Sequence, residues 1–313
     1  MDTLAPTREL TVDVLRGSSR RRRKERATKL VLQGASVFSL VVSVAILLAM
    51  AGQAIRWLTG IDLGWLWTSA GWSPRRNDFD ILTLFVGTVM VAGIAMLVAA
   101  PLGLGAALYL SEYATPRIRR VLKPILEVLA SIPSVVLGFF ALTVIQPSIV
   151  VGLIGGKGAF SYLSAGIAVG ILTVPLVASV SEDAMYAVPG AMREAAYGIG
   201  AKQRTVSVRV VFPAAISGIV AALILGFSRA IGETMVVAIA AGATGAAPRT
   251  FNPLEPGQTM TGAIASLAIG SDQVRGSGFA FGSLYFVALL LFILTFSLNV
   301  VSERFVRRVR KTY

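Results

Sequence analysis

The sequence predicts an all-α membrane protein that crosses the lipid bilayer several times, and three observations carry this prediction. Of the 313 residues, 55% are hydrophobic and only 14% are charged, whereas soluble domains carry about 25% charged residues. The mean hydropathy is +0.74. The apolar residues also form runs of about 18 or more, the length that an α-helix needs to cross about 30 Å of hydrocarbon. A soluble globular domain is therefore excluded.

Six such runs predict six transmembrane helices, at 30–57, 81–110, 124–146, 161–181, 214–242 and 281–301. The first run follows a basic stretch and is longer than the core of a cleavable signal peptide, so an uncleaved anchor is expected. The spans divide the chain into four parts: a basic N-terminal segment (1–29), the first span with its outer loop (30–80), a core of five spans (81–301) and a basic tail (302–313). A mildly apolar stretch, Met260 to Ile269, predicts a further short helix that lies on the outer face or dips into it.

The distribution of positive charge predicts the orientation of these spans. The segments 1–29, 111–123, 182–213 and 302–313 hold nine, four, four and five of the 29 Lys and Arg residues, and the alternate loops hold six. By the positive-inside rule the protein is multi-pass in the cytoplasmic membrane with both termini in the cytoplasm. The same rule accounts for the net charge of +13, so the basic run Arg20 to Lys24 is expected to face anionic membrane lipid and no nucleic acid.

Two residue types that carry much of catalytic chemistry do not occur. The chain has no Cys and no His, which excludes disulfides, thiolate metal sites and the commonest general base and metal ligand. All four Trp residues lie between the first two spans, at 57, 65, 67 and 72, and are predicted to anchor the outer loop at the lipid headgroups.

A loop of 32 residues, 182–213, is predicted to face the cytoplasm between spans four and five. A connection of that length usually has a function. Pro189-Gly190 predicts a turn, residues 191–197 a short helix, and Gly200 its end. A second helical stretch is expected from Lys202 to Pro213. Two short helices on an exposed loop suit docking into the groove of a partner protein.

The same loop resembles the EAA loop of ABC importer permeases. The matching residues keep the spacing of that family's pattern throughout, and are Glu194, Ala195, Ala196, Gly200, Val210, Phe212 and Pro213. Val210 and Phe212 stand where the family has Ile and Leu. The resemblance implies that these residues form coupling helices, which fit a cleft on the ATPase subunit and transmit its closure to the spans.

Two further segments, Ser131 to Phe140 and Ser228 to Met235, resemble the signatures of phosphate importer permeases, the PstC type more than its paralogue PstA. The resemblance implies the type I ABC importer permease architecture and a role as permease subunit in ATP-driven import of inorganic phosphate. It also implies a paralogous permease, a homodimeric ATPase subunit and an extracytoplasmic phosphate-binding protein as partners. ATP and Mg would then bind to the ATPase subunit, and this chain would hold no cofactor and catalyse no reaction itself.

Two charged residues lie inside the fifth predicted span, where each is costly. Arg229 and Glu233 are four positions apart, so they would share one helix face and partly neutralise each other. An ion pair with a purely structural role is one interpretation. The functional interpretation places Arg229, Glu233 and Thr234 on the substrate path. Arg229 can donate to two phosphate oxygens, and Glu233 can accept a hydrogen bond from the O–H of monohydrogen phosphate, a donor that sulfate lacks.

Three alternatives remain open at this point. The chain would be an ABC permease for another small oxyanion, a secondary anion transporter that uses Arg229 and Glu233 as a relay, or a membrane enzyme that acts on lipid. The secondary transporter leaves the coupling loop without a purpose, and the enzyme lacks groups for acid and base catalysis.

Overall fold

A computed structural model describes residues 19–68, 71–242, 248–269 and 278–309. The chain forms two units, residues 1–50 and 51–313, and each is considered by itself. Most of the basic N-terminal segment and the last four residues lie outside the described residues. In the first unit, the described residues from Ser19 onward belong to one helix, α2, which starts well before the apolar run and continues into the second unit.

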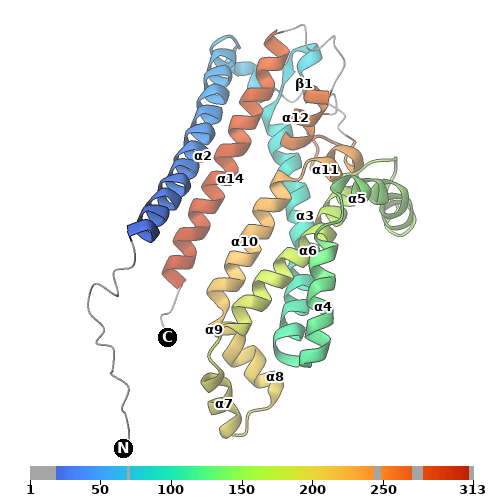
Figure 1. Cartoon of the computed structure of the whole chain (residues 1–313). Coiled ribbons are helices and arrows are strands. Elements are labelled where there is room, and N and C mark those ends of the chain that lie inside the picture. Colours follow the sequence, from blue (N-terminus) through green and yellow to red (C-terminus); the bar gives the residue numbers. More distant parts are fainter. Residues whose placement is uncertain (1–18, 69–70, 243–247, 270–277, 310–313) are drawn as a thin grey trace, which may run out of the picture. The chain divides into compact units, whose positions relative to one another are not determined.

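Among the described residues, the regular elements are helices and one small hairpin (Figure 1), joined by turns and irregular segments. In chain order the elements are α2 (Ser19–Thr59), η1 (Leu63–Trp67), β1 (Trp72–Ser73), η2 (Pro74–Arg76), β2 (Asp78–Phe79), α3 (Ile81–Leu108), η3 (Tyr109–Tyr113), α4 (Pro116–Leu129), α5 (Ser134–Phe140), η4 (Ala141–Val151), α6 (Tyr162–Tyr186), α7 (Gly190–Gly198), α8 (Gln203–Val206), η5 (Ser207–Val211), α9 (Phe212–Ala214), α10 (Ile216–Gly232), α11 (Met235–Ala240), α12 (Met260–Ile269) and α14 (Gly278–Val309). The two strands pair antiparallel, Trp72 opposite Phe79.

Five of these helical segments are long and apolar enough to cross a membrane, and a sixth candidate is a pair of helical segments bent by 71° at the start of α10. This agrees with the predicted number of spans. The bounds of the third predicted span, 124–146, are wrong. The chain leaves the helix after Leu129 and resumes at Ser134, so α5 with η4 forms the candidate span and α4 is a separate helix. Pro133 causes the break, because it has no N–H to donate and disfavours helical geometry at Ile132.

The fifth predicted span, 214–242, is also interrupted. Helix α10 ends at Gly232, and Glu233 has extended backbone angles (φ −68°, ψ 128°). The chain becomes helical again only at Met235. Glu233 therefore lies in a short non-helical link inside the predicted span.

In the second unit, α3 and α6 pack along each other and α10 packs against both (Figure 1). Glycines allow the close approach of α3 and α6: a Cβ at Gly166 would lie 2.6 Å from Ile94, and one at Gly170 would lie 2.8 Å from Val98. The buried residues between these helices are mostly Ala and Val. Small side chains thus let the backbones of α3 and α6 approach each other closely.

The four tryptophans do not share one role. Trp57 and Trp72 are buried, 4% and 0% exposed. Both rings contact Phe79, at 5.1 and 5.5 Å between centroids. Only Trp65 and Trp67 are exposed as headgroup anchors would be. The prediction of four interfacial anchors is wrong for the other two, because the β1–β2 hairpin folds them into an aromatic core.

The short helix predicted at Met260 to Ile269 is present with the same bounds as α12. Most of its first six residues are buried, and it packs against α3, α11 and α14. The backbone N–H of Met260 donates to the hydroxyl of Thr88 on α3 at 3.0 Å. The first part of α12 is thus packed into the second unit.

Candidate functional site

The loop 182–213 has the helix–turn–helix form that the sequence predicts. Helix α7 starts at Gly190, directly after Pro189, and ends at Gly198. The second helical stretch begins at Gln203 and continues without a gap through α8, η5 and α9. The loop therefore consists of two consecutive helical segments joined by a tight turn.

Gly200 makes that turn. Its φ is +80°, a value that L residues with a side chain rarely adopt. The N–H of Gly200 donates to the carbonyl of Tyr197 at 2.9 Å, and the N–H of Ala201 donates to that of Ala196 at 3.1 Å. These bonds satisfy the last carbonyls of α7, as in other helices that end on a left-handed glycine.

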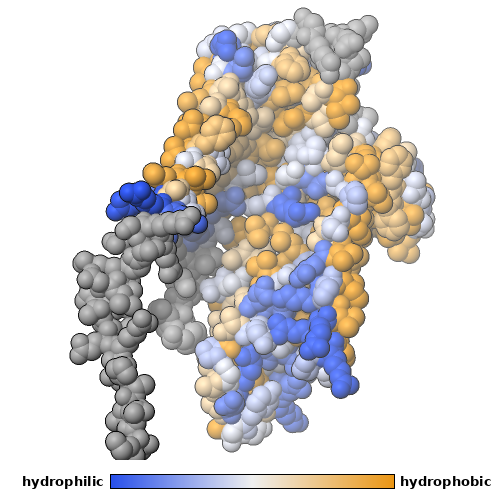
Figure 2. Space-filling view, in the orientation of Figure 1, coloured by the Kyte–Doolittle hydropathy of each residue, from blue (hydrophilic) through white to orange (hydrophobic). Residues whose placement is uncertain are grey.

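The outer side of this turn is exposed and partly apolar. Ile199 is 87% exposed and Tyr197 45%, and Glu194 and Ala195 are exposed beside them. The inner side packs on the ends of α3 and α6: Ala196, Val210 and Phe212 are partly buried around Met185, Val206 and Val211. Figure 2 shows hydrophilic side chains gathered around this end of the second unit. The arrangement offers a protruding knob whose apolar tip has no cover within the described part of the chain.

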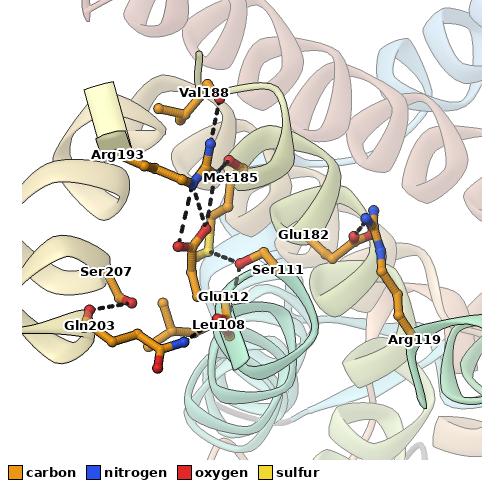
Figure 3. Close-up of polar contacts among 10 residues, drawn as sticks. All are labelled: Leu108, Ser111, Glu112, Arg119, Glu182, Met185, Val188, Arg193, Gln203 and Ser207. Carbon is orange, nitrogen blue, oxygen red and sulfur yellow. Dashed lines mark hydrogen bonds and ion pairs between the residues drawn. The ribbon is translucent and has the colours of Figure 1, made fainter. Parts of the chain in front are cut away.

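Arg193 on α7 binds the ends of two long helices (Figure 3). Its Nη2 lies 2.9 Å from Oε1 of Glu112, in the turn η3 that follows α3, and its Nε also donates to this carboxylate. Nη1 donates to the carbonyl of Val188 at 2.6 Å, and Nη2 to that of Met185 at 2.8 Å. The Glu112 side chain is only 3% exposed, so this ion pair is largely shielded from water.

Glu112 also binds the second helical segment of the loop. Nε2 of Gln203, at the start of α8, donates to the backbone carbonyl of Glu112 at 2.6 Å. The hydroxyl of Ser207 in turn donates to the Gln203 carbonyl at 2.9 Å. One residue of η3 thus holds the helices on both sides of the Gly200 turn.

A second cluster of charges joins α4 to the end of α6. The Glu182 carboxylate is fully buried and forms ion pairs with Arg119 and Lys123. Nζ of Lys123 also lies 2.6 Å from Asp183. Burial disfavours the charged ammonium, but the hydrogen bonds to Asp183 and Glu182 and their negative charges outweigh it and raise the pKa of Lys123 above its usual range. The Arg119 guanidinium also stacks over the ring of Tyr186, 3.8 Å from its centroid.

The structure separates the two charges of the fifth predicted span. Arg229 is exposed on α10, whereas Glu233 is partly buried beyond the end of that helix. Within the described part of the chain, no ion pair joins them. The prediction that they share one helix face is wrong, because the helix ends at Gly232 and Glu233 leaves the helical path.

The non-helical link is held by α12. The hydroxyl of Thr261 donates to the backbone carbonyl of Glu233 at 2.7 Å. The Thr234 hydroxyl bonds back to the carbonyl of Gly232 at 3.3 Å. Arg229, Glu233 and Thr234 therefore lie close together in the sequence at the break that follows α10. The side chains of Arg229 and Glu233 are both at least partly accessible.

Sequence reasoning missed the residues that attach the loop to the spans. Arg193 stands directly before the Glu-Ala-Ala triplet, but its partner Glu112 is 81 positions away. Glu182 and Lys123 are 59 positions apart. One signal was available in the sequence: Glu112 and Glu182 each follow an apolar run. An acidic residue that is buried at such a position needs a cation as its partner.

Several curated proteins resemble this chain along most of its length. The phosphate transport system permease protein PstC of Xylella fastidiosa (strain 9a5c) is 30% identical over 304 residues, which cover 90% of each protein. The probable ABC transporter permease protein YqgH of Bacillus subtilis is 31% identical over 94% of this chain and 95% of its own length. The phosphate transport system permease protein PstC 1 of Mycobacterium tuberculosis is 32% identical over 76% and 75%.

Solved structures show the same fold. A chain of the MetNI methionine ABC transporter in an inward-facing conformation superposes with a TM-score of 0.53 at 19% identity, covering 74% of this chain and 94% of its own. An amino acid ABC transporter gives a TM-score of 0.51, also at 19% identity. The predicted fold class, an all-α polytopic protein with the type I ABC importer permease architecture, is confirmed.

The family profile for the binding-protein-dependent transport system inner membrane component matches residues 99–311, a range that includes the loop 182–213, the break at Glu233 and helix α14. The chain belongs to this family of ABC transporter permeases.

Proposed function

We propose that this chain is one of two permease subunits of an ABC importer that moves inorganic phosphate across the cytoplasmic membrane. The observation that carries the proposal is the exposed knob of α7 and the Gly200 turn, which combines the spacing of the EAA loop with the geometry of a docking element. The names of the relatives, phosphate transport system permeases, support phosphate as the substrate.

The proposed partners are those that membership of the permease family implies. A homodimeric ATPase subunit would receive the knob in a cleft, with Tyr197 and Ile199 at its tip, and would bind ATP and Mg. A paralogous permease would complete the path, and a phosphate-binding protein would deliver the substrate on the outer side. Both termini would lie in the cytoplasm. The chain itself would then hold no cofactor and catalyse no reaction.

The proposed substrate path passes the break between α10 and α11. Arg229 offers a planar set of donors that suits two oxygens of a phosphate. Glu233 and Thr234 stand beside it, where the chain leaves the helix. Non-helical backbone at membrane depth is expected where it lines a cavity, and broken helices mark binding sites in other transporters.

Uptake of labelled phosphate into vesicles that hold the complete complex tests the proposal. We expect uptake that requires ATP, is not competed by sulfate, and is lost in Arg229→Gln while the complex stays assembled. Arg117→Gln is the matched control, because Arg117 is an exposed arginine of α4 away from the break. Normal uptake by Arg229→Gln would remove Arg229 from the path, and competition by sulfate would favour a general oxyanion permease.

A secondary anion transporter remains the competing function from another class. It would use the same charged pair, but its uptake would persist without ATP and would follow an ion gradient. Uptake in vesicles that contain this chain without any ATPase subunit separates the two functions.

A further inference from the structure

We infer that Arg193 is a positioning residue that fixes the coupling helix α7 to the ends of α3 and α6, so that movement of α7 reaches both helices together. The inference rests on the proposed function, and it deepens it by naming the link between the loop and the membrane spans. The carrying observation is the set of directional contacts that Arg193 makes with Glu112, Met185 and Val188.

Apart from Arg193, helix α7 is held by apolar packing of its partly buried residues Met192 and Ala196. It has no fully buried residue, whereas the neighbouring segment from α8 to α9 places Val206 and Val211 in the core. Apolar packing is non-directional, so by itself it leaves α7 freer to tilt than the segment from α8 to α9. Arg193 removes that freedom, because a two-pronged guanidinium–carboxylate contact fixes orientation as well as distance.

The partners of Arg193 belong to different helices. Glu112 lies in η3, which continues α3 without interruption, and its carboxylate is almost entirely buried. The carbonyl of Met185 belongs to the last turn of α6, and that of Val188 follows directly after it. A cation at the carboxyl end of a helix is favourable. Arg193 thus holds α6 through carbonyls at its carboxyl end and α3 through the Glu112 carboxylate in the segment that continues it.

Gln203 supplies a second attachment to the same point. It binds the backbone carbonyl of Glu112 from the other side of the Gly200 turn. Both helical segments of the loop are therefore joined to η3 within one residue. A displacement of α7 would reach α3 through Glu112 and α6 through the carbonyls of Met185 and Val188. No flexible segment would lie between α7 and either helix.

Lysine cannot replace this arrangement. It is a single charged group on a flexible chain, whereas arginine presents a rigid fork. In Arg193→Lys the charge pair with Glu112 can form, but the simultaneous contacts to two carbonyls cannot. The proposal therefore predicts that the amount of phosphate transported per ATP hydrolysed is highest in the wild type, lower in Arg193→Lys and lowest in Arg193→Gln.

The first experiment measures phosphate transported per ATP hydrolysed by the complete complex in vesicles. We expect this ratio to fall about fivefold or more in Arg193→Gln, a typical size for coupling between two sites, with assembly and basal ATP hydrolysis retained. Glu112→Gln should lower it too, and the double variant should be no worse than Arg193→Gln alone, because both changes break one contact. Arg117→Gln is the control and should keep the wild-type ratio.

Three results would overturn the inference. One is a wild-type ratio in both Arg193→Gln and Glu112→Gln. Another is a lower yield of complex with an unchanged ratio, which would make the contact purely structural. The third is a double variant whose loss is the product of the two single losses. If Arg193→Gln does not assemble, Arg193→Lys and Glu112→Gln decide the question by the same ratio.

A second readout does not depend on the substrate. The chain has no cysteine, so spin labels at Ala191→Cys on α7 and Tyr113→Cys at the end of η3 report the distance between these elements in the assembled complex. We expect one narrow distance with and without ATP, and a broad or ATP-dependent distribution once Arg193→Gln is added. An unchanged narrow distribution in that variant would overturn the inference even if the complex transported another anion.

Discussion

Arg193 and Glu112 form an ion pair whose carboxylate is almost fully buried, with Nη2 2.9 Å from Oε1, although 81 positions separate the two residues in the sequence. The pair lies where the loop 182–213 meets the end of α3. Breaking such a pair on one side leaves a buried charge without a partner, which is costly. The same contact therefore attaches the loop and constrains how it can move.

The turn at Gly200 should be sensitive to its backbone conformation. In Gly200→Ala a Cβ would meet nothing within 4 Å, so the entire cost comes from the positive φ, about 1–2 kcal/mol. We expect weaker association with the ATPase subunit, measured by co-purification at increasing salt. Gly198→Ala is the matched control: it also meets nothing within 4 Å but has no positive φ, and it should bind as the wild type does. Equal binding by both variants would contradict this role of the turn.

The ion pairs of Lys123 predict how stability depends on pH. Its pKa is raised in the folded protein above the usual 10.5. The folded state therefore holds this proton more tightly than the unfolded state, and the added stability is present below 10.5 and is lost as the pH rises through the folded value.

Thermal unfolding of the detergent-solubilised complex measures this effect. Between about pH 9 and pH 11.5, the unfolding temperature should fall more steeply for the wild type than for Lys123→Met. Arg204→Met is the control, since Arg204 is an exposed cation of α8, and it should keep the wild-type slope. Parallel curves for wild type and Lys123→Met would show that the pairs with Glu182 and Asp183 contribute nothing measurable.

Glu233 predicts a difference between phosphate and sulfate. Its carboxylate can accept a hydrogen bond from the O–H of monohydrogen phosphate, and sulfate has no O–H to donate. In Glu233→Gln we expect phosphate uptake to fall by about tenfold, as for the loss of a hydrogen bond to a charged group, and sulfate to become a competitor. Uptake of phosphate with sulfate as competitor, in vesicles with the complete complex, checks both. Asp78→Asn is the control, because it changes a carboxylate in the β1–β2 hairpin. It should alter neither the rate of phosphate uptake nor the competition by sulfate. If Glu233→Gln still took up phosphate without competition by sulfate, Glu233 would not be the residue that distinguishes the two anions.

Hydropathy was sufficient to predict the class of the fold and the number of spans, because burying apolar runs in lipid is a property of each run alone. The helix Met260 to Ile269 was predictable from its own apolar residues, and the helices around Gly200 from their local start and stop signals. The breaks at Pro133 and Glu233 were harder. A proline inside an apolar run can kink a helix or end it, and packing against other helices decides which.

Contacts between distant segments could not be predicted in the same way. The rings of Trp57 and Trp72 are buried because they pack with Phe79 of the hairpin and, for Trp57, with Phe279 and Phe286 of α14. From the sequence, any Lys or Arg on the same side of the membrane could have been the partner of Glu182, and by the positive-inside rule that side is rich in both residues. The residues of the loop were therefore predictable from their local pattern, whereas the residues to which the loop is attached were not.

The contact between α3 and the segment before α12 should tolerate no added carbon at Gly87. A Cβ there would collide with the carbonyl oxygen of Gln258 and lie 2.8 Å from the hydroxyl of Tyr162. Because the first of these is backbone, it cannot turn away, and we expect Gly87→Ala to lower the free energy of unfolding by about 1–3 kcal/mol. Gly93→Ala, on the same helix with nothing within 4 Å of its Cβ, should be neutral or stabilising by up to about 1 kcal/mol, since alanine favours helix. Thermal unfolding of the two variants side by side checks the difference, and equal effects would mean that the segment before α12 yields to accommodate the methyl group.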